Sequence, residues 1–245
     1  MSVFRARVKD SRNRLTQRVT FRMSIASLIP QSFWFRLSIP AARIDGLPKD
    51  KEKRRLLDLP ESCRVITSAD LEGRASWSEC RVAWNLEGLA LQFEVRDKVS
   101  PIYFDPNLPE VTDGVQIWID TRDTRDIHRA SRFCHRFTAV LIPDKGKKTV
   151  SVQFSQNPIH RAIANSAIAN PTAIHARAEA TKNGWRLEIF LGAEALTGFE
   201  PETNRRLGFA YQVGDSDRGN EFLTVGREFP IGEDPSLWAT LELQG

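Results

Sequence analysis

Apolar and polar residues alternate in short runs along most of the chain after about residue 30. The clearest unit spans residues 82–95, where two alternating runs flank the turn-forming residues 85–88, and Trp84 stands on the apolar side. A period of two is typical of a strand with one buried face, and a short glycine-containing turn joins the strands of a hairpin. This segment therefore predicts a β-hairpin with Trp84 in the core.

Similar runs recur at near-regular spacing. They span residues 33–39, 114–120, 133–143, 149–155, 175–181, 184–191, 208–215, 221–226 and 238–244. We expect the first of these to end at Pro40, residues 43–62 to form a charged surface connection, residues 159–170 a loop or a helical turn, and residues 192–199 a single helical turn. About eleven short strands without a long helix predict an all-β fold. The specific expectation is an antiparallel, jelly-roll-like β-sandwich with one or two short helical turns.

Charge is distributed unevenly between the two ends of the chain. Residues 1–55 hold 14 Lys and Arg against 4 Asp and Glu, a net charge of +10, and the remainder holds 21 against 27, a net of −6. We interpret residues 1–30 as a basic arm, or as an over-extended start before Met23, and residues 31–245 as one sandwich domain. Nucleic acid would bind only through the arm, because blocks of like charge form interaction tails.

The sequence lacks features of membrane and secreted proteins, which bears on the compartment of the protein. No apolar run is long enough to span a membrane, and the basic N-terminus has no apolar region of a secretory signal. The three cysteines are odd in number and contain no C-x-x-C pair, which favours reduced thiols over disulfides. We therefore expect a soluble, cytoplasmic protein without a membrane partner.

Common catalytic motifs are also missing from the sequence. It contains no P-loop, no G-x-G-x-x-G, no H-E-x-x-H and no G-x-S-x-G. The separation of two carboxylates for glycoside hydrolysis cannot be judged from a sequence. We therefore expect a binding protein without catalysis of its own, and a glycoside-active hydrolase stays an open alternative.

Two polar segments could hold an ion. In residues 120–137 aspartates recur every third position among arginines, which suits either a metal or polar-ligand site or a turn held by Asp–Arg pairs. In residues 214–221, Asp215 and Asp217 precede a glycine as in the opening of a calcium loop, but Gly226 stands where a closing carboxylate belongs. Structural calcium bound by Asp215 and Asp217 is therefore one interpretation, and a polar turn is the other.

Trp118 is the third candidate. If Val115, Ile117 and Ile119 face the core, strand alternation places Gln116 and Trp118 together on the outer face of the sheet. An exposed tryptophan there would be a platform for a sugar ring or another apolar surface. The alternative is a second core, in which the arm or residues 159–170 cover Trp118.

Several motifs occur in an order that resembles a known family. They are DGVQIWID at 113–120, GWRLEIFL at 184–191 followed by a helical turn, and DPSLW at 234–238 before a leucine-rich final strand. Over about residues 33–245 the chain resembles the family 9 carbohydrate-binding module within the DOMON-like superfamily. The resemblance implies a β-sandwich, structural calcium, and a carbohydrate ligand.

The resemblance also implies a set of ligand-binding residues, with departures from the family pattern. The set is Asp113, Gln116, Trp118, Arg136, Tyr211, Gln212 and Arg227. Gln116 stands where family members have a ligand-touching Glu, no Trp precedes Asp113, and Arg227 or Glu228 stands at the second position of the family's tryptophan clamp. The leading hypothesis is a carbohydrate-binding domain, and the alternative is an intracellular protein-interaction domain on the same scaffold.

Overall fold

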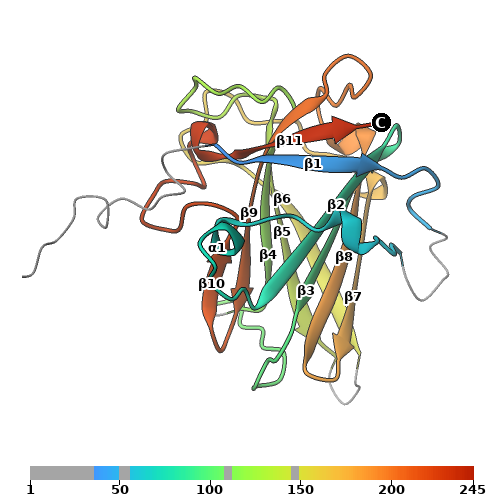
Figure 1. Cartoon of the computed structure of the whole chain (residues 1–245), viewed down its shortest axis with the longest axis vertical. Helices are drawn as coiled ribbons and strands as arrows, with labels where there is room; N and C mark the ends of the chain where they lie inside the picture. Colours follow the sequence, from blue (N-terminus) through green and yellow to red (C-terminus); the bar gives the residue numbers. More distant parts are fainter. Residues whose placement is uncertain (1–35, 50–55, 108–111, 145–148) are drawn as a thin grey trace, which may run out of the picture.

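Figure 1 shows the computed structural model, which describes residues 36–49, 56–107, 112–144 and 149–245. Its strands are β1 Ser38–Arg43, β2 Ser78–Asn85, β3 Gly88–Val95, β4 Gly114–Asp120, β5 Cys134–Pro143, β6 Val150–Asn157, β7 Ile174–Thr181, β8 Gly184–Gly192, β9 Arg206–Asp215, β10 Gly219–Phe222 and β11 Ala239–Gln244. The α-helix α1 Ser68–Leu71 and the 3₁₀ turns η3 Glu61–Cys63, η5 Pro171–Ala173, η6 Ala193–Ala195 and η7 Pro235–Leu237 lie between them. The expectation of an all-β fold is confirmed.

The strands form one large sheet that nearly closes into a barrel (Figure 1). Their order is β6-β5-β4-β9-β11-β1-β2-β3-β8-β7. The short strand β10 pairs with residues 212–215 of β9, on the edge opposite β4. Most neighbours are antiparallel, but β1 is parallel to both β11 and β2. Parallel partners need a long connection, and the segment between β1 and β2 supplies it.

Pro40 does not end its strand, contrary to the sequence expectation. β1 runs through Pro40, which is in register with Glu242 of β11. On its other side β1 meets β2 only at Ala42 and Arg43, so Pro40 faces no ladder partner there. Proline is tolerated at such an edge because its missing N–H leaves no gap in a ladder.

The inner faces of the sheet enclose the main core. The predicted hairpin forms as expected, and Trp84 and Trp185 are both fully buried in this core. Phe93 packs edge-on against Tyr211, with ring centroids 5.3 Å apart. The core therefore contains the aromatic residues that the alternating pattern predicts, and Tyr211 in addition.

Residues 43–62 are more than a surface connection, which corrects the sequence interpretation. Leu56, Leu57 and Leu59 are buried against the outer face of β2, β3 and β8. The carboxylate of Glu188 on β8 accepts hydrogen bonds from the backbone N–H groups of Leu56 at 2.7 Å and Leu57 at 3.0 Å. These hydrogen bonds from backbone amides to a buried carboxylate hold Leu56 and Leu57 against the outer face of the sheet.

Smaller differences concern single elements. β10 is shorter than the expected strand at 221–226, and residues 159–170 form a loop. Helix α1 was not expected, although the capping box between Thr67 and Asp70 that begins it is a sequence signature. The three cysteines are free and buried, as expected. The basic arm at 1–30 lies outside the described residues.

Within the described ranges, none of the helices is long and apolar enough to cross a membrane.

Candidate functional site

The outer face of β5, β4 and β9 carries a row of polar side chains. Strand alternation acts as predicted: Ile117 lies in the main core, while Gln116 is partly exposed on the opposite face. Gln116 is in register with Gln212 of β9 on one side and with Thr138 of β5 on the other. Backbone register therefore brings together side chains that are far apart in sequence.

Hydrogen bonds connect these side chains to one another. Arg136 donates from Nη2 to Oε1 of Gln116 at 2.8 Å, and Gln212 donates from Nε2 to Oδ1 of Asn220 at 2.9 Å. Asn157 of β6 donates to the Thr138 hydroxyl at 2.9 Å. We call this surface the polar face; its partly exposed residues are Gln116, Arg136, Thr138, Ser155, Asn157, Gln212 and Asn220. It offers amide, hydroxyl and guanidinium groups to a ligand.

Arg136 is the electrostatic centre of the polar face. Its Nε atom is buried and has no hydrogen-bond partner, and its bond to Gln116 engages a neutral amide. Burial lowers the pKa of Arg136 from its ordinary value, because a desolvated guanidinium is less stable in its charged form. Arginine nevertheless stays protonated in proteins, and the hydrogen bond to the neutral amide of Gln116 leaves its positive charge unneutralised.

The expectation that Trp118 lies exposed is wrong. Its side chain is only 3% exposed, in a second core with Trp238. Ile159 and the buried residues Val225 and Ile231 belong to the same cluster. The alternative of a second core is correct: the loop after β10 and the start of the 159–170 segment cover the indole. A sugar cannot stack on Trp118 in this conformation.

Arg227 and Tyr211 lie away from the polar face in different ways. Arg227 is exposed on the loop after β10, between Val225 and Ile231, which are buried in the same cluster as Trp118. Tyr211 is 1% exposed and belongs to the main core, on the opposite face from Gln212. Successive residues of a strand point to opposite faces, so Tyr211 cannot join the polar face.

Asp113, Asp215 and Asp217 gather around an internal cation. Nζ of Lys98 lies 3.2 Å from both Asp113 and Asp215 and 3.4 Å from Asp217. The Ser216 hydroxyl is also within hydrogen-bond distance of Nζ, at 2.8 Å, so the three N–H donors of the ammonium group are shared among four acceptors. Burial alone would lower the pKa of Lys98, but the carboxylates of Asp113 and Asp215 outweigh burial and raise it. The ammonium group thus stays charged.

This arrangement favours the polar turn over the calcium interpretation of Asp215 and Asp217. Their carboxylates are engaged by Lys98 and by backbone N–H groups, including those of Val99 and Ser100 on Asp217. Over the described ranges, no group of three or more His, Cys, Asp or Glu side chains is placed to hold a metal ion. No sequence pattern predicts this contact, because Lys98 lies 117 residues from Asp215 along the chain.

The arginine-rich segment 120–137 forms a turn, the second of the two alternatives. Asp120 accepts hydrogen bonds from the backbone N–H groups of Arg122 at 3.0 Å and Thr124 at 2.7 Å. Asp123 forms an ion pair with Arg125 at 3.1 Å. Aspartates commonly hold turns in this way, so nothing in the segment requires a bound ion.

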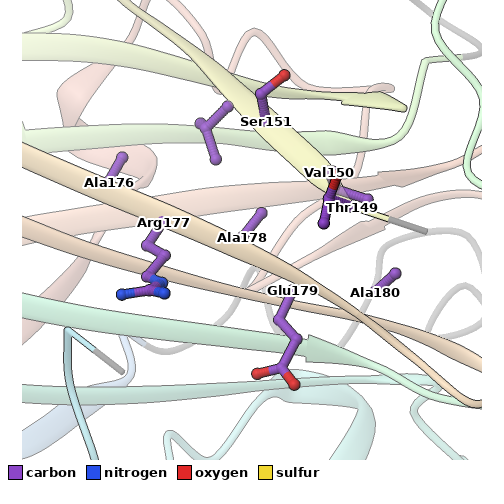
Figure 2. A pocket seen from close by; sticks show the side chains of 9 residues that line it. Thr149, Val150, Ser151, Ala176, Arg177, Ala178, Glu179 and Ala180 are labelled. Atoms are coloured by element: carbon purple, nitrogen blue, oxygen red, sulfur yellow. The ribbon is translucent and has the colours of Figure 1, made fainter. Parts of the chain in front are cut away.

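A groove lies where the two ends of the sheet approach each other, between β6 and β7. Its volume is about 550 Å³, and its walls include Ser151 of β6 and alanines of β7. Figure 2 shows Ala176 and Ala178 on one side of β7 and Arg177 and Glu179 on the other. In the described part of the chain neither facing edge pairs with another strand. Sequence reasoning did not identify this groove.

Comparison with known proteins supports the fold resemblance. Neither a scan against protein families nor a search of curated proteins finds a match. A family 9 carbohydrate-binding module from Caldicellulosiruptor kristjanssonii in complex with cellotriose is 14% identical, with a TM-score of 0.55, and the alignment covers 85% of this chain and 94% of that one. The same kind of module in complex with glucose gives 14% identity, a TM-score of 0.56, and coverage of 85% and 96%. The chain thus shares the fold of family 9 carbohydrate-binding modules.

Proposed function

We propose that the chain binds carbohydrate through the polar face and has no catalysis of its own. The observation that carries this proposal is the cluster of Gln116, Arg136 and Gln212 side chains on one partly exposed sheet face. The sequence also predicts all three as ligand-binding residues. Their arrangement is suited to a ligand rich in hydroxyl groups.

The chemistry of these groups supports a sugar ligand. An amide side chain both donates and accepts, so it can bind two neighbouring hydroxyls of a sugar ring, and a guanidinium fork donates to two acceptors at once. The polar face contains no Asp or Glu, so it holds no pair of carboxylates for acid–base hydrolysis. Binding therefore fits the polar face better than hydrolysis does.

The chain shares its fold with modules solved in complex with cellotriose and glucose, and this shared fold supports the same proposal. The support is limited to the scaffold, because fold does not determine ligand. In this chain the covered Trp118 supplies no stacking surface. We therefore expect hydrogen bonds from the polar face to carry more of the affinity than aromatic stacking does.

A glycan array followed by isothermal titration calorimetry tests the proposal. We expect binding of at least one oligosaccharide, and a loss of about tenfold or more when Gln116→Ala or Gln212→Ala removes its hydrogen bonds. Gln244→Ala is the matched control, because Gln244 is exposed at the end of β11. Absence of binding to every glycan by folded protein would contradict the proposal.

A second candidate function is binding of an extended peptide, which the groove between β6 and β7 favours. Unpaired strand edges accept an added strand, whose backbone supplies the affinity. Ser151→Arg would obstruct the groove without touching the polar face. A stoichiometric protein partner that the wild type retains and this variant loses would support the second candidate, whereas glycan binding unaffected by Ser151→Arg would favour the first.

A further inference from the structure

We infer that the saccharide bound by the polar face is acidic, carrying a carboxylate that pairs with Arg136. This inference rests on the proposed function and names the class of its ligand. Its basis is the charge of the polar face. Arg136 is the only charged residue among the seven that form this surface.

The guanidinium of Arg136 has unused donor capacity. It carries five N–H donors, of which one, on Nη2, binds the Gln116 amide oxygen, while Nε is buried without a partner. A buried donor without a partner is costly, and a buried charge without a counter-charge is costlier. A ligand carboxylate would supply the missing counter-charge, because it matches the guanidinium in charge and in geometry.

Acidic side chains on the strands of the polar face are engaged elsewhere. Glu221 of β10, next to Asn220 in sequence, accepts hydrogen bonds from the backbone N–H and the hydroxyl of Ser78. Asp120 lies on the outer side of β4 but is 1% exposed and accepts bonds from Arg122 and Thr124. Asp113, at the start of β4, is bound to Lys98. Among the described residues, no carboxylate forms an ion pair with Arg136, and burial is the one cause that shifts its pKa. The protein itself therefore does not supply the counter-charge.

Gln116 is the position that sets this preference. A carboxylate there would lie within hydrogen-bond distance of Arg136 and would neutralise it; the amide accepts the same hydrogen bond without a charge. The difference between glutamine and glutamate at this position decides whether the guanidinium is free for an acidic ligand.

An acidic saccharide fits this surface better than a small free anion does. Thr138, Ser155 and Gln212 are neutral hydrogen-bonding groups aligned across neighbouring strands on either side of Gln116. They suit the hydroxyls of a sugar, whereas Arg136 suits a carboxylate on that sugar. Acetate would engage Arg136 alone. A uronate unit is the ligand class that would engage both Arg136 and the neutral hydrogen-bonding groups.

The test compares two ligands that differ only at C6 of each sugar unit. Cellotriose and its counterpart oxidised at every C6, a trimer of glucuronate, have the same length and linkage. We expect the acidic trimer to bind wild-type protein about tenfold or more tightly than cellotriose at low salt, the scale of one charge-assisted bidentate pair. Raising the salt concentration should reduce this advantage. Arg136→Gln and Gln116→Glu should each abolish it.

Controls separate this inference from the proposed function. Arg177→Gln, on β7, removes a positive charge outside the polar face and should leave the preference intact. Sodium acetate at the same carboxylate concentration should not displace the acidic trimer. Equal or tighter binding of cellotriose, or competition by acetate, would overturn the inference and leave glycan binding standing. If folded protein bound no glycan on the array, neutral or acidic, both would fail.

Discussion

Lys98 and Asp113 form an ion pair with Nζ 3.2 Å from the carboxylate, and both side chains are almost completely buried. Asp113 also accepts hydrogen bonds from the backbone N–H groups of Tyr103 at 2.9 Å and Ser216 at 2.7 Å. One ammonium group thus joins the loop after β3, the start of β4 and the turn after β9. In this position a lysine holds the loops together as a bound cation would.

Replacement of Lys98 by Met should be strongly destabilising. It leaves Asp113 and Asp215 buried without a counter-charge, and breaking a buried ion pair by removing one partner costs about 3–5 kcal/mol. Urea denaturation at pH 7 measures the loss in free energy of unfolding. Lys182→Met, at an exposed position, is the matched control and should change stability by less than about 0.5 kcal/mol. Equal midpoints for the two variants would contradict a structural role for Lys98.

Calcium should have no effect on the stability of the wild-type protein. The carboxylates of Asp113, Asp215 and Asp217 already share the Lys98 ammonium, whose positive charge would repel a second cation. We therefore expect the same thermal midpoint in calcium chloride and in EDTA. A ligand that binds only folded protein raises the midpoint. A calcium-dependent rise would restore the calcium interpretation of Asp215 and Asp217.

Alternation along strands explains why the fold and part of the site could be predicted. A period of two fixes which side of β4 enters the core, so Gln116 was correctly placed on the outer face. Loops determine whether the outer face is covered, and loop sequences lack the two-residue alternation that makes a strand predictable. For this reason the sequence leaves open whether Trp118 is exposed or covered, and it does not predict that the leucines at 56–59 are buried.

Contacts between distant segments could not be predicted for a related reason. Lys98 meets Asp215 only because two loops converge at one end of the sheet. Tyr211 shows the limit of a resemblance: it was assigned beside Gln212, yet neighbours along a strand face opposite sides. Alternation alone would have excluded it. The groove between β6 and β7 depends on how far the sheet closes, which no local pattern encodes.

Trp118→Ala should reduce stability and not merely binding. Its indole is packed in the second core with Trp238, and truncation of a buried aromatic costs about 3–5 kcal/mol. Trp118→Phe should cost less, because the indole Nε1 has no hydrogen bond to lose. Denaturant unfolding of both variants, beside Gln116→Ala, measures the difference. If Trp118→Ala unfolded at the wild-type midpoint yet lost glycan binding, the ligand platform would be restored.

His135 should make the protein sensitive to mild acid. The imidazole is fully buried, stacks on Phe137 at a centroid distance of 6.0 Å, and forms no side-chain hydrogen bond. Burial lowers its pKa from 6.5 to about 4, because the charged ring would lose its hydration. The unfolded chain therefore binds a proton more readily than the folded protein between these two pH values.

The sign of the effect follows from this difference. Stability due to neutral His135 is fully present above pH 6.5 and is lost as the pH falls toward 4, by about 3 kcal/mol in total. Carboxylates also titrate in this range, so the informative quantity is the difference between wild type and His135→Phe. We expect that difference in unfolding free energy to change by about 3 kcal/mol between pH 7 and pH 4, with the variant less sensitive. Parallel pH profiles, measured by urea unfolding, would show that the buried imidazole is protonated or hydrated in the folded state.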